Sequence, residues 1–313
     1  MDKSGVLPKR RRRIFRKEDT ALYIMAAPSV IWLAVFCYVP MLGLLIAFQN
    51  YNNSAGVWSS PFVGFANFKF LFATTDAFSI TRNTVLYNLV FILFNMGLAL
   101  VLAMILSLLR TQRIAKVIQT IYMLPFFLSY AVINIIVYGF LDKQSGMVNS
   151  LMGTLGLPSD TNWYHKLELW PPLLVFVNAW RGVGYQTVLF LAVISGISND
   201  YYEAAMLDGA TKFQQARYIT LPHLRLIVGI SIIMAMASIF RGDFGLFYTV
   251  TRNTGLLYPV TDVIDTYVFR GLTKLNNIGM ATAAGLFQSV VGLVLVLAVN
   301  WIVTKIDAES AMF

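Results

Sequence analysis

The chain has 313 residues, of which 58% are hydrophobic and only 12% are charged, and its formal net charge at pH 7 is +9. A soluble domain carries about 25% charged residues, so this composition excludes an ordinary water-soluble protein and indicates an integral membrane protein. The one cysteine, Cys37, has no partner for an internal disulfide, and no Cys/His spacing typical of a metal site occurs.

The chain begins with a basic tail over residues 1–21, in which Lys9–Arg13 form an unbroken run. Basic residues directly before an apolar segment are typical of the cytoplasmic side of a membrane protein, where anionic lipid attracts them. A nucleic-acid-binding arm is the alternative use of such a run. The apolar segment that follows favours the first interpretation, so we expect membrane lipid as a partner and no nucleic acid.

Six apolar segments follow, each long enough to cross a bilayer, which takes about 20 helical residues. Pro28, Pro40 and Pro125 lie inside or beside these segments and predict kinks, because neighbouring helices can satisfy the freed backbone groups. The sequence therefore predicts an all-α integral membrane protein with a transmembrane domain over residues 22–313. Its six transmembrane helices are expected near residues 22–48, 84–109, 115–141, 172–198, 224–250 and 281–304.

The distribution of basic residues predicts how these helices are oriented. Six spans place both termini on one side, and fifteen Lys and Arg residues fall on that side, against seven over the longer loops opposite. Basic residues accumulate in cytoplasmic loops, so we expect both termini and the polar loop 199–222 in the cytoplasm. On the opposite side, residues 259–272 predict an interfacial amphipathic helix with Thr261 or Asp262 as its N-cap.

Three ionisable side chains stand out because they lie away from the ends of the predicted spans, where each costs of order 2.5–3.5 kcal/mol and usually faces a cavity or a partner. Arg181 lies in the fourth span, and Arg241 and Asp243 lie in the fifth. A rise of about 1.5 Å per residue places them at similar depth in the outer half of the membrane. We expect Arg181 or Arg241 to pair with Asp243 and to line a polar pathway. A buried ion pair that only joins two helices is the alternative.

Glycines and aromatic residues surround these charges. Gly182, Gly184, Gly242 and Gly245 weaken regular helix or permit close packing, and interrupted helices often mark transport sites. Aromatic faces with scattered hydrogen-bonding groups suit sugar rings, although such residues also serve as packing. The predicted substrate pathway comprises Asn178, Trp180, Arg181, Tyr185, Gln186, Arg241, Asp243, Phe244 and Tyr248.

The loop between the fourth and fifth spans carries the most specific motif of the chain. Its sequence is Glu203-Ala204-Ala205-Met206-Leu207-Asp208-Gly209-Ala210, followed eight residues later by Ile219-Thr220-Leu221-Pro222. This pattern predicts two short helical pieces that are hinged at Gly209 and end at Pro222. The spacing resembles the cytoplasmic loop of ABC importer permeases that work with a separate substrate-binding protein. The resemblance implies an element that docks into an ATPase subunit and is formed by Glu203, Ala204, Ala205, Asp208, Gly209, Ala210, Leu221 and Pro222.

The resemblance extends over most of the chain. The six spans and the stretch from Asn178 to Pro222 look like type I ABC importer permeases of the maltose-transporter class. Residues 240–244, with the basic tail, are similar to the subgroup that takes up polysaccharide fragments. The resemblance implies the permease of an ATP-driven carbohydrate (oligosaccharide) importer in the bacterial plasma (inner) membrane. Its expected partners are a second permease in a heterodimer, two ATPase subunits and an extracellular solute-binding protein.

The chain carries no phosphate-binding motif of the form G-x-x-x-x-G-K-[ST], so we expect ATP and Mg to bind on the partner ATPase and this chain not to be an enzyme. We expect no cofactor or metal on it. Two alternatives remain open. A secondary transporter would use Asp243 to carry a proton or cation, and an ABC permease could serve a non-sugar solute. Arg181 and Arg241 of the predicted pathway are compatible with an acidic oligosaccharide as the solute.

Overall fold

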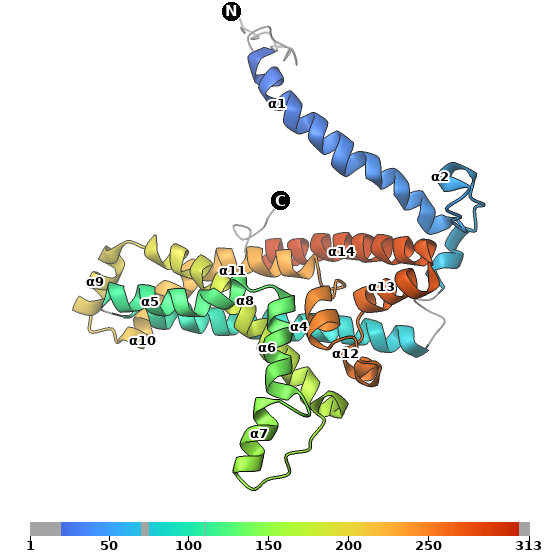
Figure 1. Cartoon of the computed structure of the whole chain (residues 1–313). Helices are drawn as coiled ribbons and strands as arrows, with labels where there is room; N and C mark the ends of the chain where they lie inside the picture. The colour runs from blue at the N-terminus through green and yellow to red at the C-terminus, as the bar shows by residue number, and fades with distance from the viewer. Residues whose placement is uncertain (1–19, 70–74, 110, 307–313) are drawn as a thin grey trace, which may run out of the picture.

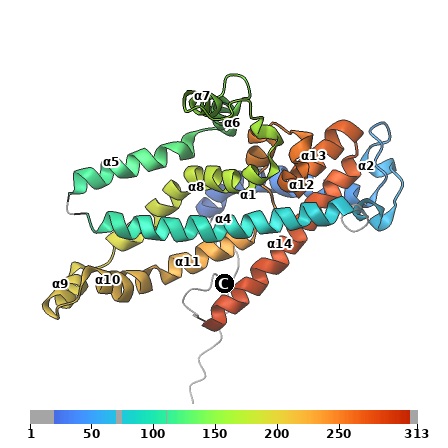
Figure 2. The same cartoon turned by 90° about the horizontal axis from the view of Figure 1, so that it is seen from below.

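The computed structural model describes residues 20–69, 75–109 and 111–306, and the predicted basic tail up to residue 19 lies outside this range. The described chain is almost entirely helical, apart from loops and one isolated β-bridge between Gln49 and Phe62. The three longest helices are α4 (Thr75–Ser107), α8 (Trp170–Ser195) and α14 (Ile278–Ile306). In Figures 1 and 2 these helices lie in one bundle with α5 (Gln112–Met123) and α11 (Leu221–Met236).

Four helical stretches are long and apolar enough to cross a membrane alone, namely Leu22–Phe48, Ala77–Ser107, Lys212–Met236 and Ile278–Lys305. Two bent pairs of helices pass the same test when each pair is taken together. The first joins α5 and η5 (Leu124–Phe127) to α6 (Tyr130–Leu141) with a bend of 98°, and the second joins α8 to α9 (Asn199–Leu207) with a bend of 72°. The break after η5 follows Pro125 and so confirms the kink predicted there. The predicted all-α fold with up to six spans is thus confirmed, and the sidedness of the termini stays a prediction.

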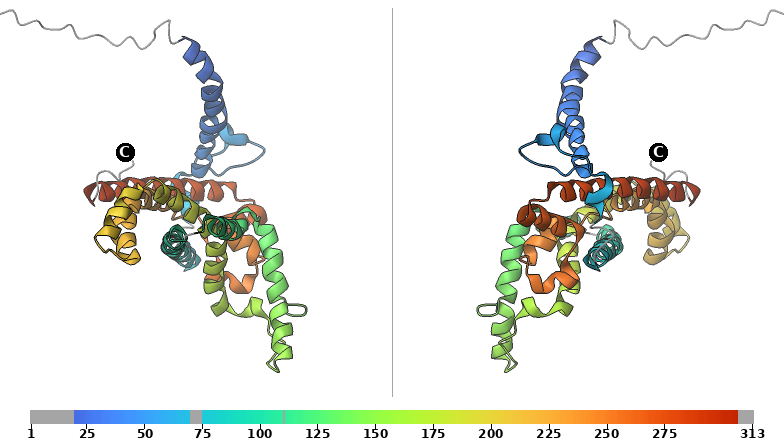
Figure 3. Two further views of the ribbon diagram at one scale, coloured as in Figure 1. Left: turned by 90° about the vertical axis from the view of Figure 1, so that its left-hand side faces the viewer. Right: turned by 90° about the vertical axis from the view of Figure 1, so that its right-hand side faces the viewer.

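The first span stands apart from the bundle (Figures 1 and 3). It consists of α1 (Thr20–Leu33), η2 (Ala34–Tyr38) and η3 (Val39–Phe48). Only 6% of its most apolar stretch of 18 residues is buried. Within the described chain, its last part, η3, packs against α14. The described residues therefore leave the apolar side chains of α1 largely uncovered, as is typical of a surface that contacts lipid or another protein.

The bundle is held together by close contact between α8 and its neighbours. Trp170, Leu174 and Phe190 of α8 are fully buried. Gly184 permits the closest approach, because a Cβ atom there would lie 2.4 Å from the backbone oxygen of Tyr122 in α5. A residue without a side chain is therefore required for this packing.

The fifth span differs from its predicted bounds of 224–250. α10 (Lys212–Gln215), η8 (Ala216–Thr220) and α11 form one continuous helical stretch. Pro222 lies in the first turn of α11 and does not end the helix, because a missing N–H is tolerated there. The continuous helix then stops at Met236, and helical backbone resumes only near η9 (Gly245–Val250). The prediction of a single helix over 224–250 is therefore wrong, and the membrane part is interrupted beside Arg241 and Asp243.

The predicted outer helix over 259–272 is split into α12 (Tyr258–Thr261) and α13 (Ile264–Leu275). Neither predicted residue caps α13, because the Thr261 hydroxyl donates to the Leu257 carbonyl and Asp262 is paired with Arg270. The Thr266 hydroxyl instead accepts a hydrogen bond from the Val263 amide at 3.0 Å. The remaining short elements are α2 (Gly56–Ser59), η4 (Gly64–Phe68), α7 (Met147–Thr154), η6 (Trp163–His165), η7 (Leu167–Leu169) and η10 (Gly255–Leu257).

Candidate functional site

The polar loop between α8 and α11 forms a compact turn at one end of the bundle (Figures 1 and 2). α9 begins after Ser198, whose hydroxyl accepts a hydrogen bond from the Asp200 amide at 3.3 Å. The helix ends at Leu207, Gly209 follows with a left-handed φ of +77°, and the Ala210 amide donates back to the Ala205 carbonyl at 2.8 Å. The backbone thus bends at Gly209 as predicted, since glycine adopts this conformation without steric cost, and its use as a hinge stays a prediction.

The same turn exposes apolar surface that the described chain does not cover. Leu207 is 90% exposed, and Met206, Glu203 and Asp208 are exposed beside it. Leu221 and Pro222, which were predicted to share this element, lie farther along the chain in the first turn of α11. The residues on either side of this pair contact α9, since the Tyr202 hydroxyl bonds to the Thr220 hydroxyl at 2.9 Å and the Tyr201 and His223 rings lie 5.7 Å apart. A role of Leu221 and Pro222 in docking an ATPase stays a prediction.

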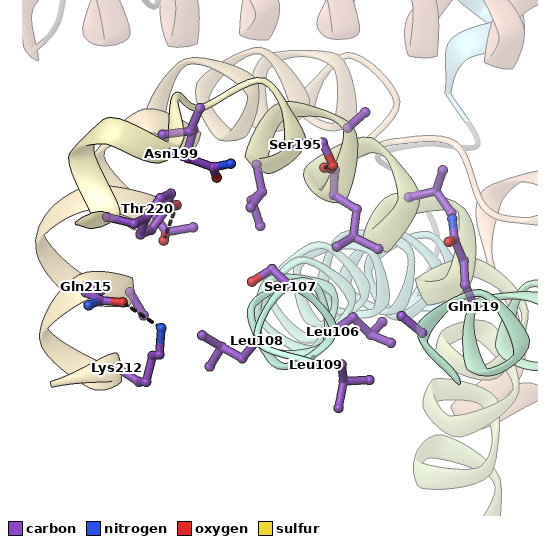
Figure 4. A pocket seen from close by; sticks show the side chains of 18 of the residues that line it. Leu106, Ser107, Leu108, Leu109, Gln119, Ser195, Asn199, Lys212, Gln215 and Thr220 are labelled. Atoms are coloured by element: carbon purple, nitrogen blue, oxygen red, sulfur yellow. Dashed lines mark hydrogen bonds between the residues drawn. The ribbon is translucent and has the colours of Figure 1, made fainter. Parts of the chain in front are cut away.

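A pocket of about 730 Å³ separates this turn from the ends of α4, α5 and α8. Lys212, Gln215 and Thr220 lie on one side of it, facing Ser107, the last residue of α4, and the following Leu108 (Figure 4). Two hydrogen bonds stiffen the loop side of the pocket. One joins Lys212 to Gln215 at 3.2 Å, and the other joins the Tyr202 hydroxyl to the Thr220 hydroxyl at 2.9 Å. The turn is thus stabilised by its own hydrogen bonds, and the pocket lies between it and the bundle.

A second, polar cavity of about 350 Å³ lies between α4, α8, α11 and the interruption of the fifth span. It brings together four of the predicted pathway residues: Asn178, Gln186, Arg241 and Asp243. Two hydrogen bonds tie its walls, from Asn95 to Asn178 at 2.8 Å and from Gln186 to Ser231 at 3.2 Å. The cavity therefore presents amide, hydroxyl, guanidinium and carboxylate groups within one space.

Four polar residues of this cavity were not among the predicted site residues. Asn88 and Asn95 lie seven residues apart in α4, and Ser231 and Ser238 have the same spacing in and just after α11. A spacing of seven places two side chains on one face of a helix. Such a pair of polar residues on one face of an otherwise apolar segment is the sequence signal that could have identified these four residues.

Arg181 does not pair directly with Asp243, because the ring of Tyr130 is between them. Arg181 donates to the Tyr130 hydroxyl at 3.3 Å and lies 4.4 Å from the centre of that ring, and the Tyr130 hydroxyl donates to Asp243. Gly245 leaves the space for the ring, since a Cβ atom there would lie 2.1 Å from it. Within the described residues, no ion pair joins either Arg181 or Arg241 to Asp243. The predicted direct pair is therefore wrong, although the two groups do share one layer.

The predicted aromatic residues lie outside the cavity walls and pack on one another. Tyr185 stacks on Phe126 with ring centres 5.0 Å apart, and Phe244 stacks on Tyr248 at 4.8 Å, next to Phe269. Trp180 also lies outside the cavity and is partly exposed. Any contact of these residues with a solute stays a prediction. Among the described residues, no group of three or more His, Cys, Asp or Glu could hold a metal ion.

Comparison with known proteins gives consistent matches. The family model described as "Binding-protein-dependent transport system inner membrane component" matches residues 95–308. Protein LplB of Bacillus subtilis (strain 168) is 34% identical over 300 residues, covering 94% of this chain and 92% of that protein. The polygalacturonan/rhamnogalacturonan transport system permease protein YteP of the same strain is 31% identical over 309 residues, covering 96% of this chain and 94% of that protein.

A solved structure agrees with these sequence matches. A chain of a bacterial ABC transporter involved in the import of the acidic polysaccharide alginate superposes with a TM-score of 0.84 at 30% identity. The match covers 93% of this chain and 97% of that chain. The apolar spans, the exposed turn at Gly209 and the polar cavity thus occur in a chain that belongs to the family of inner membrane components of binding-protein-dependent transport systems.

Proposed function

We propose that this permease forms the translocation path of an ATP-driven importer for carbohydrate oligosaccharides. The observation that carries the proposal is the composition of the polar cavity. Asn178, Gln186 and Ser231 offer both donors and acceptors, and Arg241 and Asp243 add one charge of each sign. A sugar presents neighbouring hydroxyl groups that both donate and accept, so this set matches a hydroxyl-rich solute better than an apolar or a metal-ion cargo.

The relatives support the same substrate class. YteP is named for polygalacturonan and rhamnogalacturonan transport, and the structural match belongs to an alginate importer. An acidic oligosaccharide is compatible with Arg241 in the cavity wall. Arg181 does not add to this argument, because it lies outside the cavity and interacts with Tyr130.

The exposed surfaces support partners for this chain. The uncovered α1 offers an apolar surface to a second permease subunit or lipid, and the Gly209 turn offers Met206 and Leu207 to a separate ATPase. One structurally related importer was solved with an alginate pentasaccharide-bound periplasmic protein, which supports a solute-binding protein as a partner here. ATP and Mg would bind to the ATPase, and this chain would hold neither.

The course of the fifth span supports a mechanical link between these sites. Helical backbone runs continuously from Lys212, beside the exposed turn, to Met236, beside the polar cavity. Movement of the turn by an ATPase would therefore be carried along one helix to Met236, where the interruption that contains Arg241 and Asp243 begins. Import requires in addition that ATP bind the inward-open and outward-open states with different affinity.

The test is purification of the tagged chain from native membranes in mild detergent, with its partners identified by mass spectrometry. The variants Glu203→Lys and Gly209→Pro are purified in parallel. We expect an ATPase and a second permease with the unaltered chain, and loss of the ATPase in both variants. Uptake of labelled oligogalacturonides into vesicles that contain the complex, with ATP, then tests the substrate class. A chain that purifies alone and still transports would contradict the proposal and favour a secondary transporter.

A further inference from the structure

The interruption of the fifth span leaves backbone groups without helical partners, and three distant side chains bind them. α11 ends at Met236, and the carbonyls of Ile239, Phe240 and Arg241 are not followed by a regular helical turn. Such groups are costly at membrane depth unless protein side chains or water satisfy them. We call the segment Ser238–Asp243 the break.

Asn88 of α4 binds two of these carbonyl groups. Its side-chain amide has three carbonyl oxygens within hydrogen-bond distance: Thr84 of its own helix at 2.8 Å, Ile239 at 2.9 Å and Arg241 at 3.0 Å, and it shares its two hydrogens among them. Gln288 of α14 binds the remaining one, with its amide 2.8 Å from the Phe240 oxygen. All three carbonyl groups therefore have a partner, and both partners lie in helices other than α11.

Asp265 of α13 holds the other side of the break. Its carboxylate accepts hydrogen bonds from the Gly242 amide and, at 3.1 Å, from Gln288. Gly242 permits this contact, because a Cβ atom there would lie 2.6 Å from Val263. Burial raises the pKa of the Asp265 carboxyl above its ordinary value, and its two donors and the nearby Arg241 charge act in the opposite direction. Asp265 and Gln288 thus form one connected unit with the backbone of the break.

We propose that Asn88, Asp265 and Gln288 are positioning residues that seat the break and thereby present Arg241 and Asp243 to the polar cavity. We call these three residues the seat. The seat residues belong to α4, α13 and α14, whereas the break follows α11, the helix that begins near the Gly209 turn. The seat therefore connects the end of α11 to three other helices. The inference rests on the proposed function only in treating the cavity as the path of the solute.

The physical argument is one of exchange. Asn88, Asp265 and Gln288 each carry a polar or charged group that is at least partly buried, and such a group is stable there only when it is hydrogen-bonded. The break supplies those bonds, and the seat in turn supplies the partners that the break lacks. Removing one seat side chain leaves a carbonyl or amide of the break unsatisfied, so the break should open to water while the regular helix α11 remains formed.

The test is chemical labelling of single cysteines in the full complex in membrane vesicles, in a chain with Cys37→Ala. The reporter Ile239→Cys lies in the break, where this residue is 4% exposed, and the matched reporter Ile233→Cys is 1% exposed on the regular helix α11. The probe is a small, water-soluble methanethiosulfonate, and no transported solute is needed. We expect Gln288→Met to raise the labelling rate at Ile239→Cys about tenfold, which corresponds to about 1.4 kcal/mol, and to leave the rate at Ile233→Cys within about twofold.

Conservative variants separate positioning from a general loss of folding. Asp265→Asn retains an oxygen that accepts from Gly242, so its labelling should stay near that of the unaltered chain, whereas Asp265→Leu should behave like Gln288→Met. Ser289→Ala in α14 is the control, because this exposed hydroxyl bonds only to the Gly285 carbonyl of its own helix. Equal increases at both reporters, or no increase at Ile239→Cys, would overturn the proposal. Failure to transport oligosaccharides would leave this result intact, so the two proposals fail separately.

Discussion

The contact between α8 and α5 allows a sharp prediction about two glycines of one helix. A methyl group at Gly184 would lie 2.4 Å from the Tyr122 oxygen and 2.9 Å from the Met123 Cα atom. Both are backbone atoms and cannot move aside as a side-chain tip does. At Gly182 the nearest atom is Asn95 Nδ2 at 3.7 Å, which is ordinary contact. Gly184→Ala and Gly182→Ala therefore make the same chemical change with opposite steric consequences.

The surroundings of the two glycines determine how much each substitution changes the stability of the protein. Overpacking against a fixed neighbour costs about 1–3 kcal/mol, and contact with backbone places Gly184→Ala at the upper end, about 3 kcal/mol. Gly182→Ala should instead be neutral or stabilise by about 0.5–1 kcal/mol, because alanine loses less backbone entropy in a helix than glycine does. We expect the purified complex with Gly184→Ala to melt at a clearly lower temperature than the complex with Gly182→Ala.

The assay is the loss of the monodisperse elution peak of the complex after stepwise heating, with both variants compared against the unaltered chain. ATP-dependent uptake at a low temperature serves as the second readout. Melting of Gly184→Ala at the temperature of Gly182→Ala would refute the close approach of α8 and α5 that underlies the reasoning.

Three further predictions concern other contacts. Gly209→Asn should retain most transport and Gly209→Val should lose it, because asparagine tolerates the left-handed backbone and a β-branched residue does not. The amount of assembled permease pair should be the same in both variants, and uptake and co-purified ATPase are measured. Tyr130→Phe should keep the ring beside Gly245 but remove the hydroxyl that joins Arg181 to Asp243, so uptake should fall while the melting temperature changes little; unchanged uptake would show that this link is dispensable. Arg270→Met should destabilise the chain by about 3–5 kcal/mol, because it leaves the buried Asp262 carboxylate unpaired, and the double variant Arg270→Met with Asp262→Leu should recover part of the lost melting temperature.

The all-helical membrane fold was predictable because it depends on local properties of the chain. An apolar run of sufficient length must close its backbone hydrogen bonds within one helix, whatever surrounds it. The turn at Gly209 is equally local, since its left-handed backbone is a property of glycine itself. The proline at position 222 misled the prediction because a proline in the first turn of a helix and a proline that stops one look alike in the sequence.

The composition of the cavity depended on contacts between residues far apart in the chain. On α8, Asn178 and Gln186 face the cavity, whereas Arg181 and Tyr185 face η5 and α6. The packing of α8 on α4 and α5 determines which side of the helix faces the cavity. Spacing alone grouped these residues by depth but could not say which neighbour each would meet. The interruption after Met236 likewise requires Asn88, Asp265 and Gln288, three side chains that reach it only after the helices have packed.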